Sequence, residues 1–256
     1  MIKSLYDYRE LLKSNVKKDI RGKYKGSFLG ILWSFLNPLL MTLVYAIVFP
    51  FILKSGIEHY TTYLIIGILP WTFFTTVISQ GTFTVIANSG IVKKVYFPRE
   101  ILPISVSLSG LVNFLISCLI IILFLIFSGI GFSQYVLFLP LIIITQFFLS
   151  LGIIFITSAI DVYIRDFEYI VSFVLNMLFY ATPILYSSDM FVGSSFEWIM
   201  KLNPMAVIIN CYREVLYYKS APSIENLIIV LFGSLLLCYV GYKIFKRLEK
   251  GFAEEI

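Results

Sequence analysis

The sequence predicts an all-α polytopic membrane protein with six transmembrane helices, an N-terminal amphipathic helix at the interface and a re-entrant external helical hairpin before the last span. Apolar residues make up 59% of the chain and charged residues only 14%, against about 25% charged in a typical soluble domain. Long stretches contain no charged residue at all, and the basic residues gather on one side of the expected spans. This composition excludes a soluble enzyme, a disordered chain and a nucleic-acid-binding protein, so we expect no nucleic acid among the partners.

The spans follow from the charge-free stretches. A helix needs about 20 mainly apolar residues to cross the hydrocarbon. The stretch 101–160 is too long for one helix and breaks at the turn-prone segment 129–134. The expected spans are 28–53, 60–86, 101–128, 135–160, 169–187 and 225–243, within a single membrane domain over residues 1–256.

The positions of Lys and Arg predict the orientation. Sixteen of the 20 lie before the first span, in the loops after the second and fourth spans, or after the sixth. Because basic residues are concentrated in the cytoplasmic segments of membrane proteins, we expect a multi-pass protein with both termini in the cytoplasm.

Segments outside the spans have their own patterns. In residues 1–25, Leu5, Tyr8, Leu12, Val16 and Ile20 recur at helical spacing among basic residues, which is typical of an amphipathic helix in the headgroup layer. The segment 88–100 mixes basic and aromatic residues, and 161–168 is a cluster of opposite charges. The external segment 188–222 is apolar for a loop, and we expect two short helices there, at 189–201 and 204–218. Asn203 and Pro204 would be the N-cap and first residue of the second helix.

Familiar catalytic chemistry is missing from the sequence. It has three cysteines and one histidine, without the spacing of a metal site, and it has no phosphate-binding loop or other nucleotide motif. We therefore expect no catalytic residue, no metal and no cofactor on this chain. Spans without acidic or basic residues also argue against an ion-driven carrier.

Uncharged polar and aromatic residues within the spans are the candidates for contact with a substrate. Aromatic faces stack on sugar rings and amides bond hydroxyl groups, so these residues would suit a passage for sugars. The candidates are Trp71, Phe73, Phe74, Thr75, Asn176 and Tyr180. Two other interpretations stay open, because polar residues often join helices inside a bundle and Trp and Tyr favour the headgroup belt.

Several motifs resemble a known family. The run from Lys23 to Pro38 (KYKGSFLGILWSFLNP) resembles the start of the membrane subunits of bacterial polysaccharide ABC exporters, in the type-2 ABC transporter family. The resemblance continues in family order over nearly the whole chain, through GILPWTFF at 67–74, FPREILP at 97–103, DVYIRD at 161–166, ATPILY at 181–186 and LNPM at 202–205.

The resemblance implies a bacterial inner-membrane permease that dimerises with a second copy of itself and pairs with two separate ATPase subunits, which would bind ATP and Mg²⁺. It implies an undecaprenyl-linked polysaccharide, O-antigen or teichoic acid, as substrate. Residues that would couple the permease to the ATPase are Asn88, Lys93, Lys94, Tyr96, Phe97, Arg165 and Asp166. Residues of an external gate would be Trp198, Asn203, Pro204 and Tyr212.

Other functions fit the same sequence. One is an exporter of the same fold for a drug, lipid or small molecule, and another is an assembly or anchoring subunit without transport. A third is a membrane-embedded transferase acting on lipid-linked sugars, which would need a catalytic acid near a membrane face. The available acids are Asp161, Asp166 and Glu168 inside, and Glu58, Asp189, Glu197 and Glu214 outside.

Overall fold

The computed structural model describes residues 6–22, 28, 30–53, 57–191, 193–194 and 197–256. All regular structure within these ranges is helical. The elements are α2 (Arg9–Gly22), η1 (Gly30–Leu32), α3 (Trp33–Leu53), α4 (Tyr60–Ala87), α5 (Ser89–Val92), α6 (Ile101–Phe127), η2 (Gln134–Phe138), α7 (Leu139–Tyr163), α8 (Phe167–Tyr180), η3 (Ser188–Phe191), α9 (Glu197–Leu202), α10 (Pro204–Leu216), α11 (Ile224–Leu248), η4 (Glu249–Gly251) and α12 (Phe252–Glu255).

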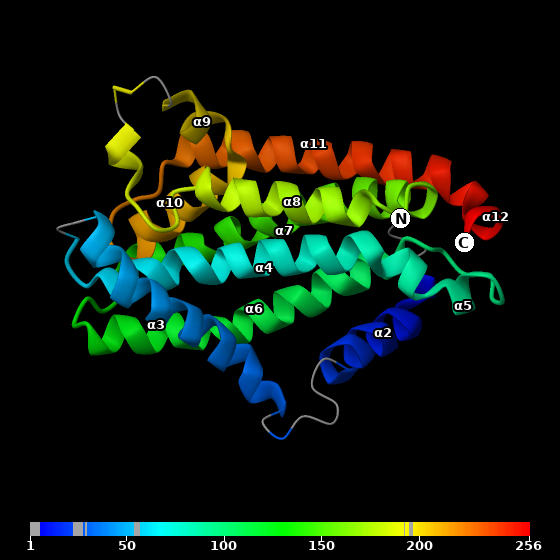
Figure 1. Cartoon of the computed structure of the whole chain (residues 1–256), viewed down its shortest axis with the longest axis horizontal. Coiled ribbons are helices and arrows are strands. Elements are labelled where there is room, and N and C mark those ends of the chain that lie inside the picture. The colour runs from blue at the N-terminus through cyan, green and yellow to red at the C-terminus, as the bar shows by residue number, and fades with distance from the viewer. Residues whose placement is uncertain (1–5, 23–27, 29, 54–56, 192, 195–196) are drawn as a thin grey trace.

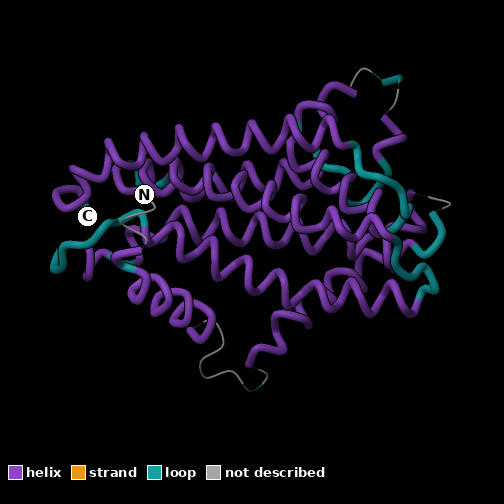
Figure 2. The backbone as a smooth tube through the Cα atoms, turned by 180° about the vertical axis from the view of Figure 1, so that it is seen from behind, coloured by secondary structure: helices purple, strands orange, loops and turns teal. Residues whose placement is uncertain are grey.

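The long helices form an elongated bundle. In Figure 1, α4, α6, α7, α8 and α11 run along the long axis, while α2 and α3 lie at an angle to it. Two ends can be distinguished: α5 and α12 lie at one, and α9 and α10 at the other. The view from behind shows the same arrangement, with the teal loops mostly at the two ends (Figure 2). We refer to these as the α5 end and the α10 end.

Among the described residues, four helices are long and apolar enough to cross a membrane: Tyr60–Ala87, Ile101–Phe127, Gln134–Tyr163 and Ile224–Glu255. They correspond to the predicted spans 60–86, 101–128, 135–160 and 225–243. The other two predicted spans, 28–53 and 169–187, correspond to the shorter apolar helices Leu36–Phe49 and Phe167–Tyr180. The structure therefore supports four crossings by length and composition.

The helix predicted at 169–187 ends earlier than expected, at Tyr180. Residues preceding a proline are disfavoured in the helical conformation, and Pro183 follows Thr182. Segment 182–185 is nevertheless buried. Its backbone oxygens find partners on other helices: Tyr60 donates to the Leu185 oxygen at 2.7 Å and Arg213 to the Ile184 oxygen at 2.7 Å. Side chains thus supply the donors that these two oxygens would have had in a continued helix.

Helix α4 lies at the centre of the bundle, and most of its residues are buried. Pro70 lies inside α4 and has no backbone N–H, so one helical hydrogen bond is missing there. The buried Gln146 of α7 donates to the Pro70 oxygen at 2.7 Å and accepts from the Tyr212 hydroxyl of α10 at 3.1 Å. Gln146 therefore joins three helices by polar contacts, which is the interhelical role expected of amides in a membrane bundle.

Small residues bring α7 and α11 close together, and these two helices form the most extensive pair in the bundle. A Cβ atom on Gly152 would lie 2.7 Å from the Cys238 backbone nitrogen, and one on Gly241 would lie 2.6 Å from the Gly152 oxygen. Because nothing larger than glycine fits there, the two backbones are in direct contact.

Helix α2 contacts the α5 end of the bundle. In the described part of the predicted helix 1–25, the apolar stripe at Tyr8, Leu12, Val16 and Ile20 is partly buried, whereas the basic residues Arg9, Lys13, Lys17 and Arg21 are exposed. Residues 1–5 and 23–25 of that prediction lie outside the described residues. Lys18 donates to the Asn88 side-chain oxygen at 3.1 Å, which connects α2 to the start of α5.

Candidate functional site

A groove of about 410 Å³ lies between α3, α4 and α8, and we call it the α3–α4–α8 groove. It is lined by Asn37, Pro38, Met41 and Tyr45 of α3, by Ile68, Trp71, Thr72, Thr75 and Ser79 of α4, and by Ser172, Leu175, Asn176, Phe179 and Tyr180 of α8. None of these residues is acidic or basic. The groove is therefore a predominantly apolar surface with scattered hydroxyl and amide groups.

Aromatic rings connect the three helices of the groove. The Phe179 ring lies 6.0 Å from the Tyr45 ring and 5.9 Å from the Trp71 ring, measured between centroids. The Phe74 ring supports Trp71 from within the bundle at 5.5 Å. At such distances aromatic pairs attract one another beyond simple burial. The rings therefore form a continuous aromatic cluster across α3, α8 and α4, in which Tyr45 and Phe179 are partly exposed and Trp71 is buried.

The polar groups of the groove include several without intramolecular partners. Asn37 and Asn176 are both exposed, and within the described ranges neither side chain makes a hydrogen bond. The Thr75 hydroxyl, by contrast, donates to the Trp71 oxygen at 3.1 Å. The two free amides, each able to donate and accept, can bind hydroxyl groups of a ligand whose rings lie on the aromatic surface.

The structure brings together four of the six residues predicted to line a passage: Trp71, Thr75, Asn176 and Tyr180. Phe73 does not line the groove: it is as buried as Trp71, but its ring stacks on Phe114 of α6 at 5.0 Å. Phe74 is buried behind Trp71. The sequence reasoning missed Tyr45 and Phe179. In an apolar helix, residue type alone does not show which face of the helix an aromatic side chain occupies. The position of Phe179 directly before the predicted Tyr180 could have indicated that it also lies near the site.

A second cavity lies at the α5 end, and we call it the α5 cleft. It measures about 320 Å³ and is lined by Ile86, Ser89, Gly90, Lys93, Val162, Arg165, Glu255 and Ile256. Lys93 and Arg165, which the resemblance placed in two separate contact segments, therefore line one cavity. Both are exposed, and neither makes an ion pair within the described part of the chain.

The remaining residues predicted to couple the chain to an ATPase fall into two groups. Lys94, Tyr96 and Asp166 are exposed, and the Tyr96 side chain is 94% accessible. Phe97 is buried in a small apolar cluster with Val92 and Leu102. Asn88 donates to the Thr84 oxygen at 2.8 Å as well as accepting from Lys18. Phe97 and Asn88 thus hold the segment 88–100 in place, while its Lys94 and Tyr96 side chains are exposed.

The α10 end is closed around a buried arginine. Arg213 of α10 is 1% exposed. It donates to the backbone oxygens of Pro183 and Ile184, and its guanidinium lies 3.6 Å from the centroid of the Tyr63 ring. Burial lowers the pKa of Arg213 to about 10, which leaves it charged at neutral pH. Gly67 makes room for it, because a Cβ there would lie 2.9 Å from an Arg213 nitrogen.

The residues predicted for an external gate occupy different environments. Asn203 caps α10, accepting from the Met205 and Ala206 nitrogens at 3.0 and 3.3 Å, and Pro204 is the first residue of that helix, as predicted. Tyr212 is buried in the bundle against Gln146. Trp198 is 59% exposed on α9. In the described part of the predicted helix 189–201, the structure has the 3₁₀ turn η3 and the helix α9, and Gly193 and Ser194 between them are not helical.

Three of the seven acids that a transferase could use make structural hydrogen bonds. Asp161 accepts from the Glu168 nitrogen at 3.1 Å, at the start of α8. Glu214 accepts from the nitrogen and hydroxyl of Ser223, at 2.8 and 2.7 Å. Glu197 accepts from the Gly193 nitrogen at 3.1 Å. In the described ranges, no group of His, Cys, Asp and Glu could hold a metal ion.

The four long apolar helices found among the described residues are those of a polytopic membrane protein. The chain belongs to the ABC-2 type transporter family, whose model matches residues 10–217. It is similar to the O-antigen export system permease protein RfbA of Klebsiella pneumoniae, at 38% identity over 96% of this chain and 94% of the relative. The protein of the same name from Myxococcus xanthus is 33% identical over 100% of this chain and 99% of the relative.

Proposed function

We propose that this chain is the transmembrane subunit of an ATP-driven exporter that moves an undecaprenyl-linked polysaccharide across the bacterial cytoplasmic membrane. Two relatives of nearly full-length similarity are named as permeases of O-antigen export, which favours an O-antigen-like polymer over teichoic acid. Two copies of the chain would form the passage, and two ATPase subunits would bind ATP and Mg²⁺.

The chemistry of the α3–α4–α8 groove is the observation that carries the substrate class. The partly exposed rings of Tyr45 and Phe179, which pack against the buried Trp71, offer apolar faces to sugar rings, and the amides of Asn37 and Asn176 offer hydrogen bonds to hydroxyl groups. Apolar walls with a few placed polar groups are typical of ligand sites. Exposed apolar residues on α3 and α8 flank the groove, so a second copy could close it while the lipid anchor stays in the bilayer.

The α5 end is the proposed contact with the ATPase. Lys93 and Arg165 line the α5 cleft there, and Tyr96, three residues after Lys93, is nearly fully exposed. The charge distribution argues that this end is cytoplasmic, because α2, the segment 93–99 and the last turns of α11 carry most of the basic residues. The α10 end would then face outward.

The test is polymer export by variants of the groove. We expect Tyr180→Ala combined with Asn176→Leu to reduce export strongly, because both side chains are exposed and can be removed without opening the core. Tyr169→Ala is the matched control: Tyr169 and Tyr180 are 68% and 72% exposed on the same helix, but only Tyr180 lines the groove. Surface polymer would be measured in cells that lack the native permease.

Two results of this experiment, and one of a second experiment in which ATP hydrolysis is blocked, have distinct meanings. Loss of export in the double variant alone, with normal membrane level and ATPase association, supports the proposed passage. Normal export in the double variant contradicts contact between the groove and the polymer. Export that continues when ATP hydrolysis by the partner is blocked would contradict an ATP-driven exporter.

A further inference from the structure

The segment Glu249–Ile256, which follows α11, folds back against the α5 end of the bundle. It consists of η4 and α12, and Figure 1 shows α12 at the same end as α5. The segment lies beyond residues 10–217, the part of the chain that the family model matches. No motif in the sequence predicted a role for it.

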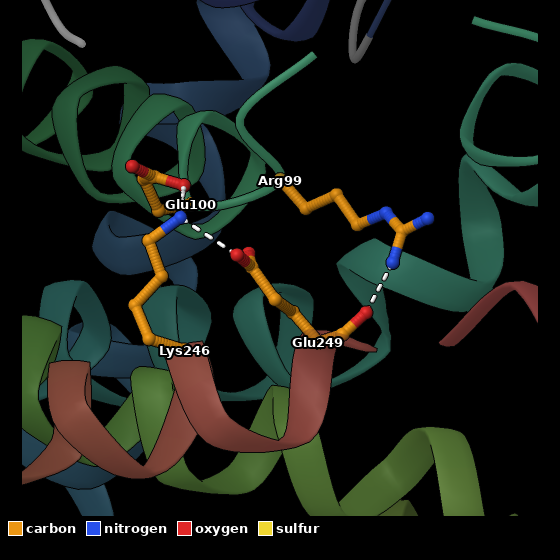
Figure 3. A network of polar contacts seen from close by, with 4 residues as sticks. All are labelled: Arg99, Glu100, Lys246 and Glu249. Atoms are coloured by element: carbon orange, nitrogen blue, oxygen red, sulfur yellow. Dashed lines mark hydrogen bonds and ion pairs between the residues drawn. The ribbon is translucent and has the colours of Figure 1, made fainter. Parts of the chain in front are cut away.

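A polar network fixes the start of this segment (Figure 3). The Lys246 ammonium lies 2.7 Å from a carboxylate oxygen of Glu100 and 2.7 Å from one of Glu249. Glu100 is fully buried, so its charge requires this cation. Arg99 donates to the backbone oxygen of Glu249. The network therefore ties the beginning of α6 to the end of α11.

Apolar contacts fix the rest of the segment. Phe252 is fully buried, and its ring lies 5.4 Å from that of Phe245 and 6.2 Å from that of Tyr163. The Tyr163 hydroxyl donates to the Leu248 oxygen at 2.8 Å. Ile256 packs against the cluster of Val92, Phe97 and Leu102. The segment is thus held by α6, α7 and α11 together.

These anchors place Glu255 and Ile256 in the wall of the α5 cleft, which Lys93 and Arg165 also line. Glu255 makes no ion pair with another described residue. The cleft consequently presents two cations, Lys93 and Arg165, from two different segments, and the Glu255 carboxylate from the segment 249–256. Such a charge pattern fits a protein surface of complementary charge better than a simple anion, which Glu255 would repel.

We propose that the segment Glu249–Ile256 forms a third wall of the docking surface for the ATP-hydrolysing subunit, beside the segments that contain Lys93 and Arg165. The inference rests on the proposed function. The docked subunit would present a carboxylate to Lys93 and Arg165 and a basic group to Glu255. Because the segment is anchored to α11, movement of the docked subunit would reach α11 as well as α4 and α7.

Site-directed crosslinking in the assembled complex tests this surface. Cysteine would be placed singly at Lys93, Arg165, Glu255 or Ala253, in a chain whose Cys118, Cys211 and Cys238 have been replaced, and coupled to a photoreactive maleimide. Ala253 is the matched control, because it is exposed in α12 but does not line the α5 cleft. We expect crosslinks to the ATPase subunit from Lys93→Cys, Arg165→Cys and Glu255→Cys, several-fold above those from Ala253→Cys.

The outcomes separate this inference from the proposed function. Crosslinks from Lys93→Cys and Arg165→Cys but not from Glu255→Cys overturn the third wall and leave the proposed coupling intact. Equal crosslinking from Glu255→Cys and Ala253→Cys also overturns it. Absence of crosslinks from Lys93→Cys and Arg165→Cys would contradict the ATPase contact itself.

The polar network provides an independent test of the anchoring. Lys246→Met should abolish the crosslink from Glu255→Cys, because it removes the ion pairs of Lys246 with Glu100 and Glu249, whereas Lys246→Arg should preserve it, because it keeps a cation at this position. The variant Glu100→Gln with Lys246→Met keeps the assay informative if Lys246→Met alone fails to fold. A full Glu255→Cys crosslink in the double variant would contradict the anchoring role of the ion pairs.

Discussion

Arg213 shows how one residue can organise an end of the bundle. Removing a guanidinium from water is costly unless its hydrogen bonds are replaced. Here the Pro183 and Ile184 oxygens accept from it, and the Tyr63 ring covers its face. These oxygens are available because α8 has ended at Tyr180. The end of α8 and the burial of Arg213 therefore depend on each other.

We expect Arg213→Met to destabilise the protein by about 2–3 kcal/mol, because it leaves two buried backbone oxygens without donors. Arg213→Lys should not restore stability, because one ammonium cannot bond both oxygens and also cover the Tyr63 ring. Thermal unfolding in detergent would measure the effect. Arg247→Met, at an exposed arginine of α11, is the control, and an equal loss in both variants would contradict the role given to Arg213.

At the scale of the elements, the pair α7–α11 depends on glycine at two positions where the backbones touch. Gly152→Ala or Gly241→Ala would force the two helices apart, and overpacking of this kind costs about 1–3 kcal/mol. Gly233 is also on α11, but a Cβ there would meet nothing within 4 Å. Gly233→Ala should therefore stabilise the helix by about 0.5–1 kcal/mol.

The midpoint of thermal unfolding, measured for the three variants in the same detergent, distinguishes these effects. A fall for Gly152→Ala and Gly241→Ala with a rise for Gly233→Ala is expected. If all three variants shifted in the same direction, helix propensity rather than the contact of α7 with α11 would determine stability.

The elements were predictable where one physical signal decides them. Hydropathy gave the four long helices, since crossing the hydrocarbon requires continuous apolar sequence. The capping of α10 by Asn203 was predictable because it is local. The end of α8 was predicted wrongly, because hydropathy continues past Tyr180 whereas Pro183 limits the backbone. The ion pair of Glu100 with Lys246 was not predicted, since its partners lie far apart in sequence.

The residue types of the candidate site were predictable from composition, but the arrangement of the individual side chains was not. Composition indicated that aromatic and amide residues would matter, and four of the six predicted residues share the α3–α4–α8 groove. Which face of a helix each ring occupies depends on packing between helices, so Phe73 and Phe74 were included although they are buried. The resemblance placed Lys93 and Arg165 in two separate segments, and only the fold brings them to one cleft.

The orientation of the whole molecule can be tested with two positions at opposite ends. In a chain lacking the native cysteines, Tyr96→Cys should react with a membrane-impermeant maleimide in inverted vesicles, and Ala221→Cys in intact spheroplasts. Both positions are exposed, and the two side chains lie beyond opposite ends of the long helices. The expectation follows from the concentration of Lys and Arg near the α5 end. Labelling of Tyr96→Cys from outside would reverse the proposed orientation.

The absence of acidic and basic residues from the lining of the α3–α4–α8 groove affects how a polymer would travel along it. An ion pair in a membrane interior creates a deep energy minimum, and a charged chain would stop there. Contacts with rings and amides are weaker and resemble one another from one sugar to the next. The free energy of a sliding polymer would then vary little with its position, so friction would be low at every register. A groove of this kind cannot count repeat units, and the length of the exported chain would have to be set by another component.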